Sequence, residues 1–177
     1  AIELGFSGYP SLQKSLQELI KNKLTTVQRL DLSNDYICNG YTLKGVLKAD
    51  MENIRATMEK INYSTFEDVV NNIFEAKRIY IVGLRSSMAL AEFLGFYLNV
   101  ILQNVKTVGY GISDIFEEMI NVGEGDLVIG IGFPRYANRT IDVLSFAQDR
   151  GATVVALTDS IVSPLAQRAD YALIAQS

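Results

Sequence analysis

Hydrophobic residues in the second half of the chain form short uninterrupted runs, and longer segments with helical spacing separate these runs. Runs of this length are typical of strands that are buried on both faces of a parallel sheet. Their alternation with helices is the pattern of consecutive β-α-β units. The five runs lie at residues 79–82, 107–108, 127–131, 154–157 and 171–174. They predict an α/β fold with a doubly wound, mainly parallel sheet of five strands.

The segments between the runs predict the helices of this fold. They lie near residues 87–102, 113–121, 138–150 and 163–168. Gly123, Gly125 and Gly151 mark the turns that lead into the third and fourth strands. A doubly wound sheet binds its ligand beyond the carboxyl ends of the strands. The loops that follow the strands are therefore where we expect binding residues.

The first half of the chain has the spacing of helices without intervening strands. Residues 11–24 carry apolar side chains three and four positions apart, which predicts an amphipathic helix. A second set of apolar residues forms one seam along a predicted helix. This seam is expected to pack against the chain's own core or against a second copy of the chain. Its members are Leu47, Met51, Ile54, Met58 and Ile61. Ser64 and Glu67 have the spacing of a capping box, so Ser64 is predicted to be the N-cap of the next helix.

These patterns divide the chain into three parts. Residues 1–24 form an N-terminal helical segment, which begins as if partway through a helix and is interrupted by Gly5 and Gly8. Residues 25–42 are predicted to be a linker. Residues 43–177 form the α/β domain with its leading helices. At 177 residues and 49% hydrophobic composition, one main domain is the expectation.

Composition excludes several classes of function. The chain has 16 basic and 20 acidic residues, a formal charge of -4, so it has no general electrostatic attraction for nucleic acid. The single cysteine, Cys38, excludes an intrachain disulfide. The absence of histidine excludes Ser-His-Asp triads and histidine-based metal centres. We expect no cofactor and no metal. No apolar run reaches the roughly 18 residues that would suggest a membrane span, so we expect no membrane contact and a cytoplasmic location.

The loop after the first strand is the first candidate for ligand binding. It reads Gly-Leu-Arg-Ser-Ser-Met from Gly83 to Met88. Glycine allows a sharp turn, and two hydroxyls precede a long helix whose free amides suit an anion such as phosphate. The candidates here are Gly83, Arg85, Ser86 and Ser87. The loop lacks the glycines of a dinucleotide fingerprint and the lysine of a P-loop, and its serines could instead serve only as helix caps.

Two further loops add candidates. The loop after the third strand runs from Gly130 to Thr140, and guanidinium groups in it could bind phosphate bidentately. The alternative is that its two arginines are solvated surface residues. After the fourth strand, the sequence Thr-Asp-Ser at residues 158–160 offers hydroxyls but could equally be a turn and a cap. The candidates from these two loops are Phe133, Arg135, Tyr136, Arg139 and Thr158.

These motifs support a family assignment. The chain from Arg78 to Gln176 resembles the SIS (sugar isomerase) domain, in the version found in the RpiR (MurR) family of bacterial transcriptional regulators. Three pieces carry the resemblance: Ile-Tyr-Ile-Val-Gly-Leu-Arg-Ser-Ser at 79–87, Gly-Asp-Leu-Val-Ile-Gly-Ile-Gly-Phe-Pro-Arg-Tyr at 125–136, and Val-Val-Ala-Leu-Thr-Asp at 154–159. The last piece continues with Ser-Pro-Leu-Ala at 163–166 and Ala-Asp at 169–170. In addition, Leu-Gly-Phe-Ser-Gly-Tyr-Pro at 4–10 looks like the segment after the recognition helix of that family's helix-turn-helix domain.

The resemblance implies a fold and a function. It implies a flavodoxin-like SIS fold that binds a phosphosugar effector, and a homodimer or higher homo-oligomer. It also implies that operator DNA is bound by a helix-turn-helix domain, most of which would lie before Ala1, and that a final SIS helix would follow Ser177. In such domains hydroxyls of the loops after the first and third strands hold the phosphate, and Ser86 and Ser87 match the first of these loops. The loop after the third strand departs from the usual Ser/Thr-rich stretch, and Arg135 there is a possible substitute.

Two other functions remain open at this stage. Some SIS proteins are sugar-phosphate isomerases, which need a placed base next to a carbonyl. Without histidine, the candidates for a base are Glu92, Glu117 and Glu118, and each is expected on the solvated face of a helix. A dimerisation module without a ligand is the other alternative. The SIS sensor reading assigns no catalytic residue.

Overall fold

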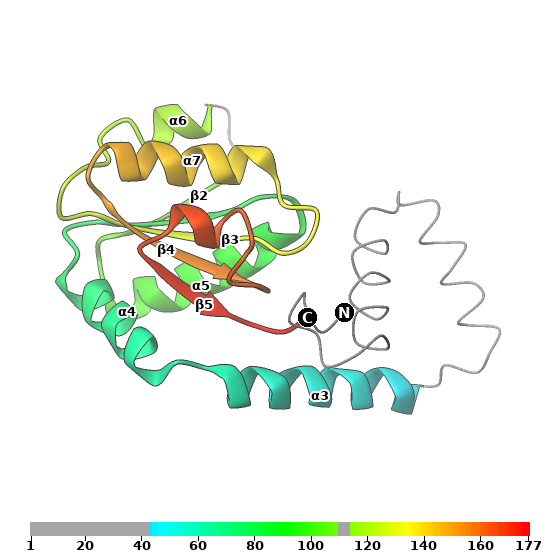
Figure 1. Cartoon of the computed structure of the whole chain (residues 1–177). Coiled ribbons are helices and arrows are strands. Elements are labelled where there is room, and N and C mark those ends of the chain that lie inside the picture. Colours follow the sequence, from blue (N-terminus) through cyan, green and yellow to red (C-terminus); the bar gives the residue numbers. More distant parts are fainter. Residues whose placement is uncertain (1–42, 110–113) are drawn as a thin grey trace, which may run out of the picture. The chain divides into compact units, whose positions relative to one another are not determined.

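The computed structural model describes residues 43–109 and 114–177, and its centre is one five-stranded sheet (Figure 1). The strand order is β2-β1-β3-β4-β5, and every pairing is parallel. The strands are β1 (Ile79–Gly83), β2 (Val105–Val108), β3 (Leu127–Ile131), β4 (Thr153–Thr158) and β5 (Tyr171–Ile174). The predicted doubly wound α/β fold is confirmed.

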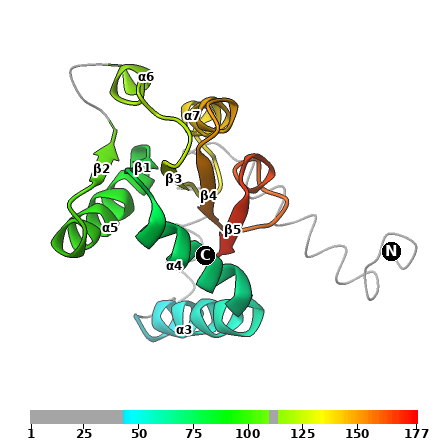
Figure 2. The same cartoon turned by 90° about the vertical axis from the view of Figure 1, so that its left-hand side faces the viewer.

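The helices lie on both faces of the sheet. Their bounds are α3 (Leu43–Lys60), α4 (Tyr63–Glu75), α5 (Met88–Ile101), α6 (Ile115–Glu118) and α7 (Asn138–Asp149), with short 3-10 helices η2 (Arg85–Ser87) and η3 (Ala166–Arg168). Figures 1 and 2 show α6 and α7 on one side of the sheet and α4 and α5 on the other. The predicted helix at residues 11–24, the predicted linker at 25–42 and the segment at 4–10 lie outside the described residues.

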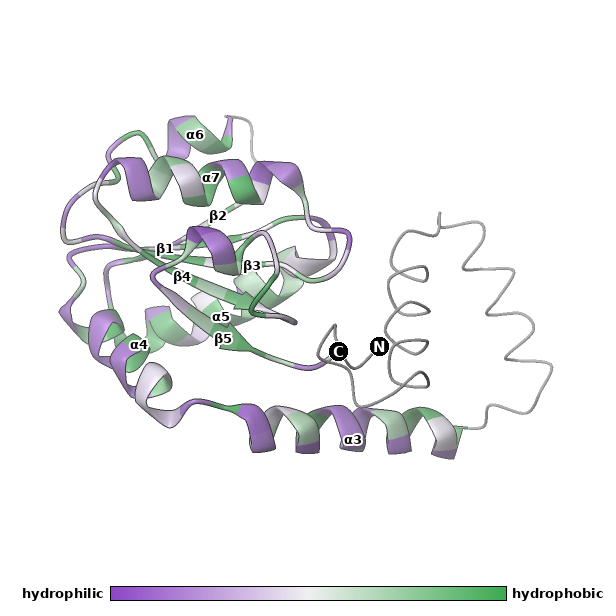
Figure 3. Ribbon diagram, in the orientation of Figure 1, coloured by the Kyte–Doolittle hydropathy of each residue, from purple (hydrophilic) through white to green (hydrophobic). Residues whose placement is uncertain are grey.

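Alternation along each strand supplies a separate hydrophobic core to each face. In β1, Tyr80 and Val82 pack with α6 and α7 residues, whereas Ile79 and Ile81 pack with α4 and α5 residues. All five β1 residues are buried. Figure 3 shows the strands in the green of hydrophobic side chains. A strand buried on both faces needs apolar residues at consecutive positions, which is why the short runs identified the central strands.

Two helix starts differ from the prediction. The N-cap of α4 is Asn62, not Ser64: the Asn62 side chain accepts a hydrogen bond from the Thr65 amide at 3.2 Å. Asn62 has extended backbone angles, as an N-cap requires, and Ser64 already lies inside the helix. The capping box occurs instead at Asp114 and Glu117, at the start of α6. The helices expected at 113–121 and 163–168 are shorter, at 115–118 and 166–168.

The chain separates into two compact units, residues 1–49 and 50–177, and α3 contains the boundary. Within the second unit, the predicted apolar seam of α3 does not enter the core. Met51, Ile54 and Met58 are 68%, 69% and 61% exposed. The opposite side of the helix contacts the end of the chain, where the Gln176 amide donates to Thr57 Oγ1 at 2.9 Å.

An ion pair between the half-exposed Arg78 and the buried Asp126 links the starts of two neighbouring strands. The Asp126 side chain is fully buried and accepts hydrogen bonds from Arg78 Nε at 3.0 Å and Nη2 at 2.7 Å. The Asp126 carboxylate also accepts a hydrogen bond from the Gly123 amide at 3.0 Å. Arg78 in turn donates to the Asn121 carbonyl at 2.6 Å. The pair thereby fixes the turn before β3 against the residue that precedes β1.

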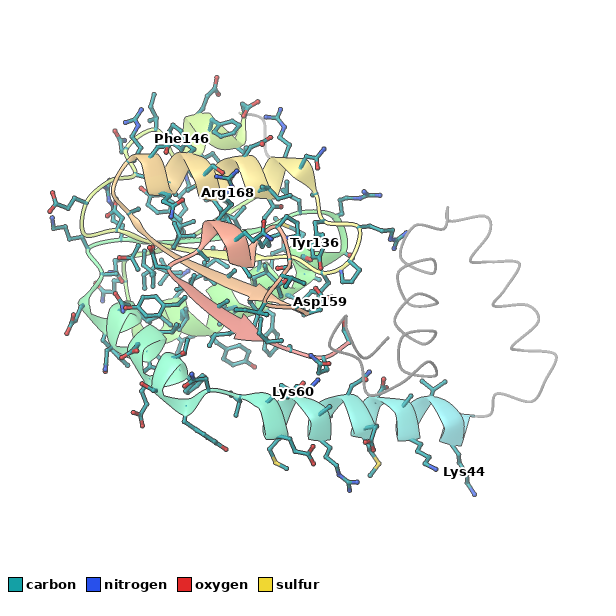
Figure 4. The ribbon with its side chains drawn as sticks, in the orientation of Figure 1. Lys44, Lys60, Tyr136, Phe146, Asp159 and Arg168 are labelled. Atoms are coloured by element: carbon teal, nitrogen blue, oxygen red, sulfur yellow. The ribbon has the colours of Figure 1, made fainter. Side chains whose placement is uncertain are left out.

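At the opposite edge of the sheet, a second polar contact joins the loops that follow β3 and β4. The Tyr136 hydroxyl donates to Asp159 Oδ1 at 2.6 Å, and Thr158 Oγ1 donates to the same oxygen at 3.2 Å. Figure 4 shows Tyr136 and Asp159 together at this edge. Burial, and next the bond to Asp159, raise the pKa of Tyr136 well above its ordinary value. The phenol therefore remains a hydrogen-bond donor at any physiological pH.

The Asp126 carboxylate is expected to contribute strongly to stability. Replacing Asp126 with alanine removes both bonds to Arg78 and leaves the Gly123 amide without its partner, so the free energy of unfolding should fall by roughly 2–4 kcal/mol. Urea unfolding followed by circular dichroism measures the change. Glu124→Ala is the matched control, because that side chain is exposed and forms no ion pair in the described part of the chain. Equal losses in the two variants would contradict the assignment.

The Tyr136 bond should give a distinct dependence of stability on pH. Because the folded-state pKa is raised, its contribution is present below the unfolded pKa of about 10 and is lost as the pH rises above that value. Tyr136→Phe should cost roughly 1 kcal/mol at neutral pH, and its melting temperature should fall less than that of the wild type in alkaline buffer. Tyr63→Phe, at an exposed tyrosine, should retain the wild-type profile.

Candidate functional site

The first loop of the site depends on a close approach between β1 and α5. A Cβ atom at Gly83, the last residue of β1, would lie 2.5 Å from the Ser87 carbonyl oxygen and 2.9 Å from the Ala91 Cβ. Such distances leave no room for a side chain. Glycine at this position therefore brings the first turn of α5 against the end of the strand.

A cavity of about 220 Å³ lies between the loops that follow β1 and β3. Its walls are residues 84–87 from the first loop, residues 131–135 from the second, and Ala137 and Thr140 at the start of α7. This is the place at which a doubly wound sheet is expected to bind a ligand. The volume is below the roughly 300–1,000 Å³ of sites for drug-sized molecules, so it suits a small ligand.

Two arginines in the cavity wall have unusual backbone conformations. Arg85 has a φ angle of 59° and Arg135 one of 72°, and no other non-glycine residue of the described ranges has a positive φ. A bulky residue held in this region costs roughly 1–3 kcal/mol, and such residues gather at functional sites. Neither guanidinium forms an ion pair or a hydrogen bond with any other described residue. Both positive charges are therefore available to a ligand.

The cavity wall has a strongly positive character for an acidic chain. Among its described residues there are two arginines and no aspartate, glutamate or lysine. The whole chain, by contrast, has a formal charge of -4. A concave surface of one sign concentrates ligands of the opposite sign. The cavity is therefore suited to an anion.

Two buried hydroxyl groups also line the cavity. Ser87 is 6% exposed and Thr140 is 2% exposed, and neither hydroxyl has a hydrogen-bond partner among the residues that the structure describes. Buried polar groups are almost always hydrogen-bonded in native proteins. Both hydroxyls line the cavity, so a water molecule or a ligand in it can supply their partners. Ser86, in the same loop, is exposed.

The two long helices that begin at the cavity have no side-chain cap. The N-caps of α5 and α7 are Ser87 and Ala137, and neither side chain accepts a hydrogen bond from the first turn. Asn62 and Asp114, in contrast, cap α4 and α6. The positive end of the helix dipole favours an anion at each start. At α5, however, the amides of Ser87 and Met88 already donate to the carbonyls of Leu84 and Arg85 within η2.

The structure brings together five of the nine residues predicted for the site. Arg85, Ser86, Ser87, Phe133 and Arg135 line the cavity, and Gly83 lies behind it at the end of β1. Thr140 was within the second loop of the prediction but was not chosen as a ligand-binding residue. One feature of the sequence could have identified Thr140. It lies in the first turn of a helix whose N-cap, Ala137, has no side chain that can accept a hydrogen bond.

Three predicted residues do not line the cavity. Arg139 forms an ion pair with Asp114 at 2.9 Å and lies 5.9 Å from the ring centre of Phe116. The hydroxyls of Tyr136 and Thr158 both donate hydrogen bonds to Asp159, and these bonds join the loops that follow β3 and β4.

The carboxylates considered for catalysis also lie outside the cavity wall. Glu117 accepts the Asp114 amide within the capping box, Glu118 pairs with Lys106 at 3.3 Å, and Glu92 is exposed on α5. The described wall contains no histidine, lysine or carboxylate that could act as a general base. Within residues 43–109 and 114–177 there is no cluster of three potential metal ligands and no helix that could cross a membrane.

Several known proteins are similar to this chain in sequence or in fold. Residues 72–177 match the SIS domain family. An HTH-type transcriptional regulator of Haemophilus influenzae is 27% identical over 176 residues, which are 97% of this chain and 60% of that protein. The sugar isomerase domain of an RpiR transcription factor from Sphaerobacter thermophilus has 33% identity and a TM-score of 0.74, over 78% of this chain and 77% of that one.

A fourth comparison concerns a regulator solved with a ligand. NanR of Vibrio vulnificus, in complex with ManNAc-6P, has the same fold with a TM-score of 0.66 and 20% identity, over 98% of this chain and 59% of that chain. The present chain thus spans about three fifths of the length of these two full regulators. More than half of its residues match the family, and its fold is similar to that of the RpiR sugar isomerase domain. The chain belongs to the SIS domain family, in the form carried by RpiR-type transcriptional regulators.

Proposed function

We propose that this chain is the effector-sensing and dimerisation domain of a transcriptional regulator, and that its cavity binds a phosphosugar. The observation that carries the proposal is the group of unpartnered polar side chains at one cavity: Arg85, Arg135, Ser87 and Thr140. Guanidinium groups, hydroxyls and helix amides are the usual partners of phosphate oxygens. A phosphate would satisfy groups that the described residues leave without partners.

In this arrangement the phosphate contacts the start of α5. The hydroxyls of Ser86 and Ser87 are its partners, and Gly83 permits their position at the end of β1. Arg135 reaches the ligand from the opposite wall. Phe133 offers an apolar surface beside it. Tyr136, Thr158 and Arg139 act indirectly, because their bonds to Asp159 and Asp114 hold the surrounding loops.

We infer that the domain senses the sugar without converting it. The described cavity wall offers anion-binding groups but no general base, which an aldose-ketose isomerase requires. The relatives point the same way: they include HTH-type and RpiR transcription regulators, and NanR was solved with a phosphosugar. Ligand binding would then alter how a helix-turn-helix domain in the whole protein meets operator DNA.

The dimerisation part of the proposal rests on the outer face of α5. Five large apolar side chains on this helix are 54–71% exposed: Phe93, Phe96, Tyr97, Val100 and Ile101. The rings of Phe93 and Phe96 lie 4.8 and 5.3 Å from that of Tyr97. Contiguous exposed patches of this kind mark protein interfaces. A second copy of the chain, in a homodimer or higher homo-oligomer, is the partner that we propose.

Phosphosugars should stabilise the chain against heat. At a ligand concentration of roughly one hundred times Kd, binding adds about 2.7 kcal/mol, which corresponds to a rise in melting temperature of about 5 °C or more. A thermal-shift panel of hexose and pentose phosphates measures it, with the unphosphorylated sugars as controls. If no phosphosugar stabilises the chain, the sensor function fails and the scaffold function is favoured; turnover of any of them would favour an isomerase.

Arg135→Gly should separate binding from folding. Glycine adopts a positive φ without strain, so the unliganded variant should melt at or above the wild-type temperature, by up to about 1 kcal/mol of added stability. The shift caused by a phosphosugar should nevertheless shrink, because a ligand contact is lost. Arg168→Gln, at an exposed arginine outside the cavity, should change neither quantity. A full ligand shift in Arg135→Gly would remove this residue from the site.

Val100→Glu should weaken self-association. The wild-type chain should sediment as a dimer or larger species in analytical ultracentrifugation, whereas a charge in the centre of the proposed interface should give monomers without loss of fold, since Val100 is 71% exposed. Val162→Glu places the same change at a position 73% exposed in a different part of the chain and should leave the mass unchanged. A monomeric wild type would refute the interface.

A further inference from the structure

Helix α3 has an exposed apolar seam along one side. The side chains of the seam are spaced four and three residues apart, and each is more than half exposed: Leu47, Met51, Ile54 and Met58. The half-buried residues of the same stretch lie on the other side of the helix: Asn53, Ala56 and Thr57. Among the described residues, none buries the seam. An apolar stripe of this kind on a helix is typical of a surface that packs against another element.

The spacing of the seam is that of a two-stranded coiled coil. Met51 and Met58 occupy core position a of consecutive heptads, and Leu47 and Ile54 occupy core position d. The half-buried Ala56 then falls at position f, which lies farthest from the partner helix in such a pair. The packing of α3 on its own domain therefore leaves both core positions open to a second helix.

The charged residues beside the seam favour one direction for a pair. In this register Asp50 lies at position g, and Lys48 and Arg55 lie at position e. Parallel helices place position g of one copy beside position e of the other, five residues later, so Asp50 would meet Arg55. Antiparallel helices place e beside e, so cations would meet cations. Asp50 is exposed and forms no ion pair within the described residues, and Arg55 has only a 3.9 Å contact with Glu52.

We propose that α3 pairs in parallel with α3 of a second copy of the chain, with Met51 and Ile54 in the core and Asp50 beside Arg55 across it. This contact is separate from the α5 interface and goes beyond the proposed function. A seam of about two heptads is too short to hold two helices together alone. The pairing is therefore weak by itself, and it agrees with the monomers expected of Val100→Glu.

A parallel pair has a consequence for the whole protein. The segments that precede α3 in the two copies would leave from the same end of the pair. Two DNA-reading units that bind adjacent half-sites need this arrangement, because both must reach the same duplex.

Disulfide trapping tests the pairing, because a covalent bond captures a weak contact. Met51→Cys and Met58→Cys would each be made in a Cys38→Ser background, oxidised with copper phenanthroline and separated on a non-reducing gel. Equivalent residues lie opposite one another in a parallel pair, so both variants should form covalent dimers. They should do so about tenfold faster than Glu59→Cys, whose exposed side chain lies off the seam. Circular dichroism checks that each variant is folded.

The two positions together distinguish parallel from antiparallel helices. Met51 and Met58 are seven residues apart, or about 10 Å along the helix. If antiparallel helices cross at one of these positions, the equivalent residues at the other lie about 21 Å apart, whereas a disulfide spans at most about 7 Å between Cα atoms. A covalent dimer at only one position would overturn the parallel arrangement. A covalent dimer at neither, or equal rates in all three variants, would overturn the pairing and leave the seam to another segment or another protein.

Charge reversal tests the flanking ion pair. In the Met51→Cys chain, Asp50→Lys should slow dimer formation about fivefold, because it replaces attraction to Arg55 with repulsion. Adding Arg55→Glu should restore the rate to within about twofold. Glu59→Lys changes the charge by the same amount off the seam and should have no effect. Each rate is divided by the rate at which the same thiol reacts with Ellman's reagent, which removes local effects on thiol reactivity.

The outcomes of the charge reversal decide the direction of pairing independently of the cysteine positions. If Glu59→Lys slows the reaction as much as Asp50→Lys does, general repulsion explains both and the ion pair is refuted. If Arg55→Glu fails to restore the rate, the parallel register is likewise refuted.

This inference and the proposed function can fail separately. A chain that binds a phosphosugar but forms no covalent dimer through α3 would retain the sensor function and refute the pairing. A chain that forms the dimer at both cysteine positions but binds no phosphosugar would support the pairing and refute the sensor function.

Discussion

The parallel pairing of β1 with β3 places Gly83 directly opposite Ile131, and the loops that leave these two residues form the walls of the cavity. Because the strands run in the same direction, their carboxyl ends lie at one edge, and residues 48 positions apart in the sequence come together there. The ion pair between Arg78 and the buried Asp126 fixes the other end of the same two strands. The distance between Arg85 and Arg135 is therefore set by the register of the sheet, and the loops only choose their local conformations.

Much of the fold follows from sequence patterns because burial on both faces requires consecutive apolar residues. The runs at 127–131 and 171–174 match β3 and β5 to the residue. The edge strand β2 was predicted two residues too short, because Lys106 interrupts its apolar run, as an exposed edge allows. Helix starts were less predictable. Asn62 and Ser64 both have N-cap side chains, and only the backbone angles of the folded chain select Asn62.

The site was predictable as a set of loops but not as a set of contacts. Arginine, serine and glycine after a buried strand indicate anion binding wherever they occur in an α/β fold. The role of Arg139 depends on Asp114, and that of Tyr136 depends on Asp159, and these partners are 25 and 23 residues distant in the chain. Positive φ angles at Arg85 and Arg135 had no sequence signal either, since arginine rarely adopts them.

The two helices that begin at the cavity belong to different layers of the molecule. Helix α5 packs on one core and α7 on the other, and the sheet separates them along most of its width. A ligand in contact with both helix starts would act as a clamp between the two layers at their one common edge. Local opening of either layer would then require release of the ligand, so binding would slow amide hydrogen exchange on both faces of the sheet together. Occupancy of a small site would in this way become rigidity of the whole sheet.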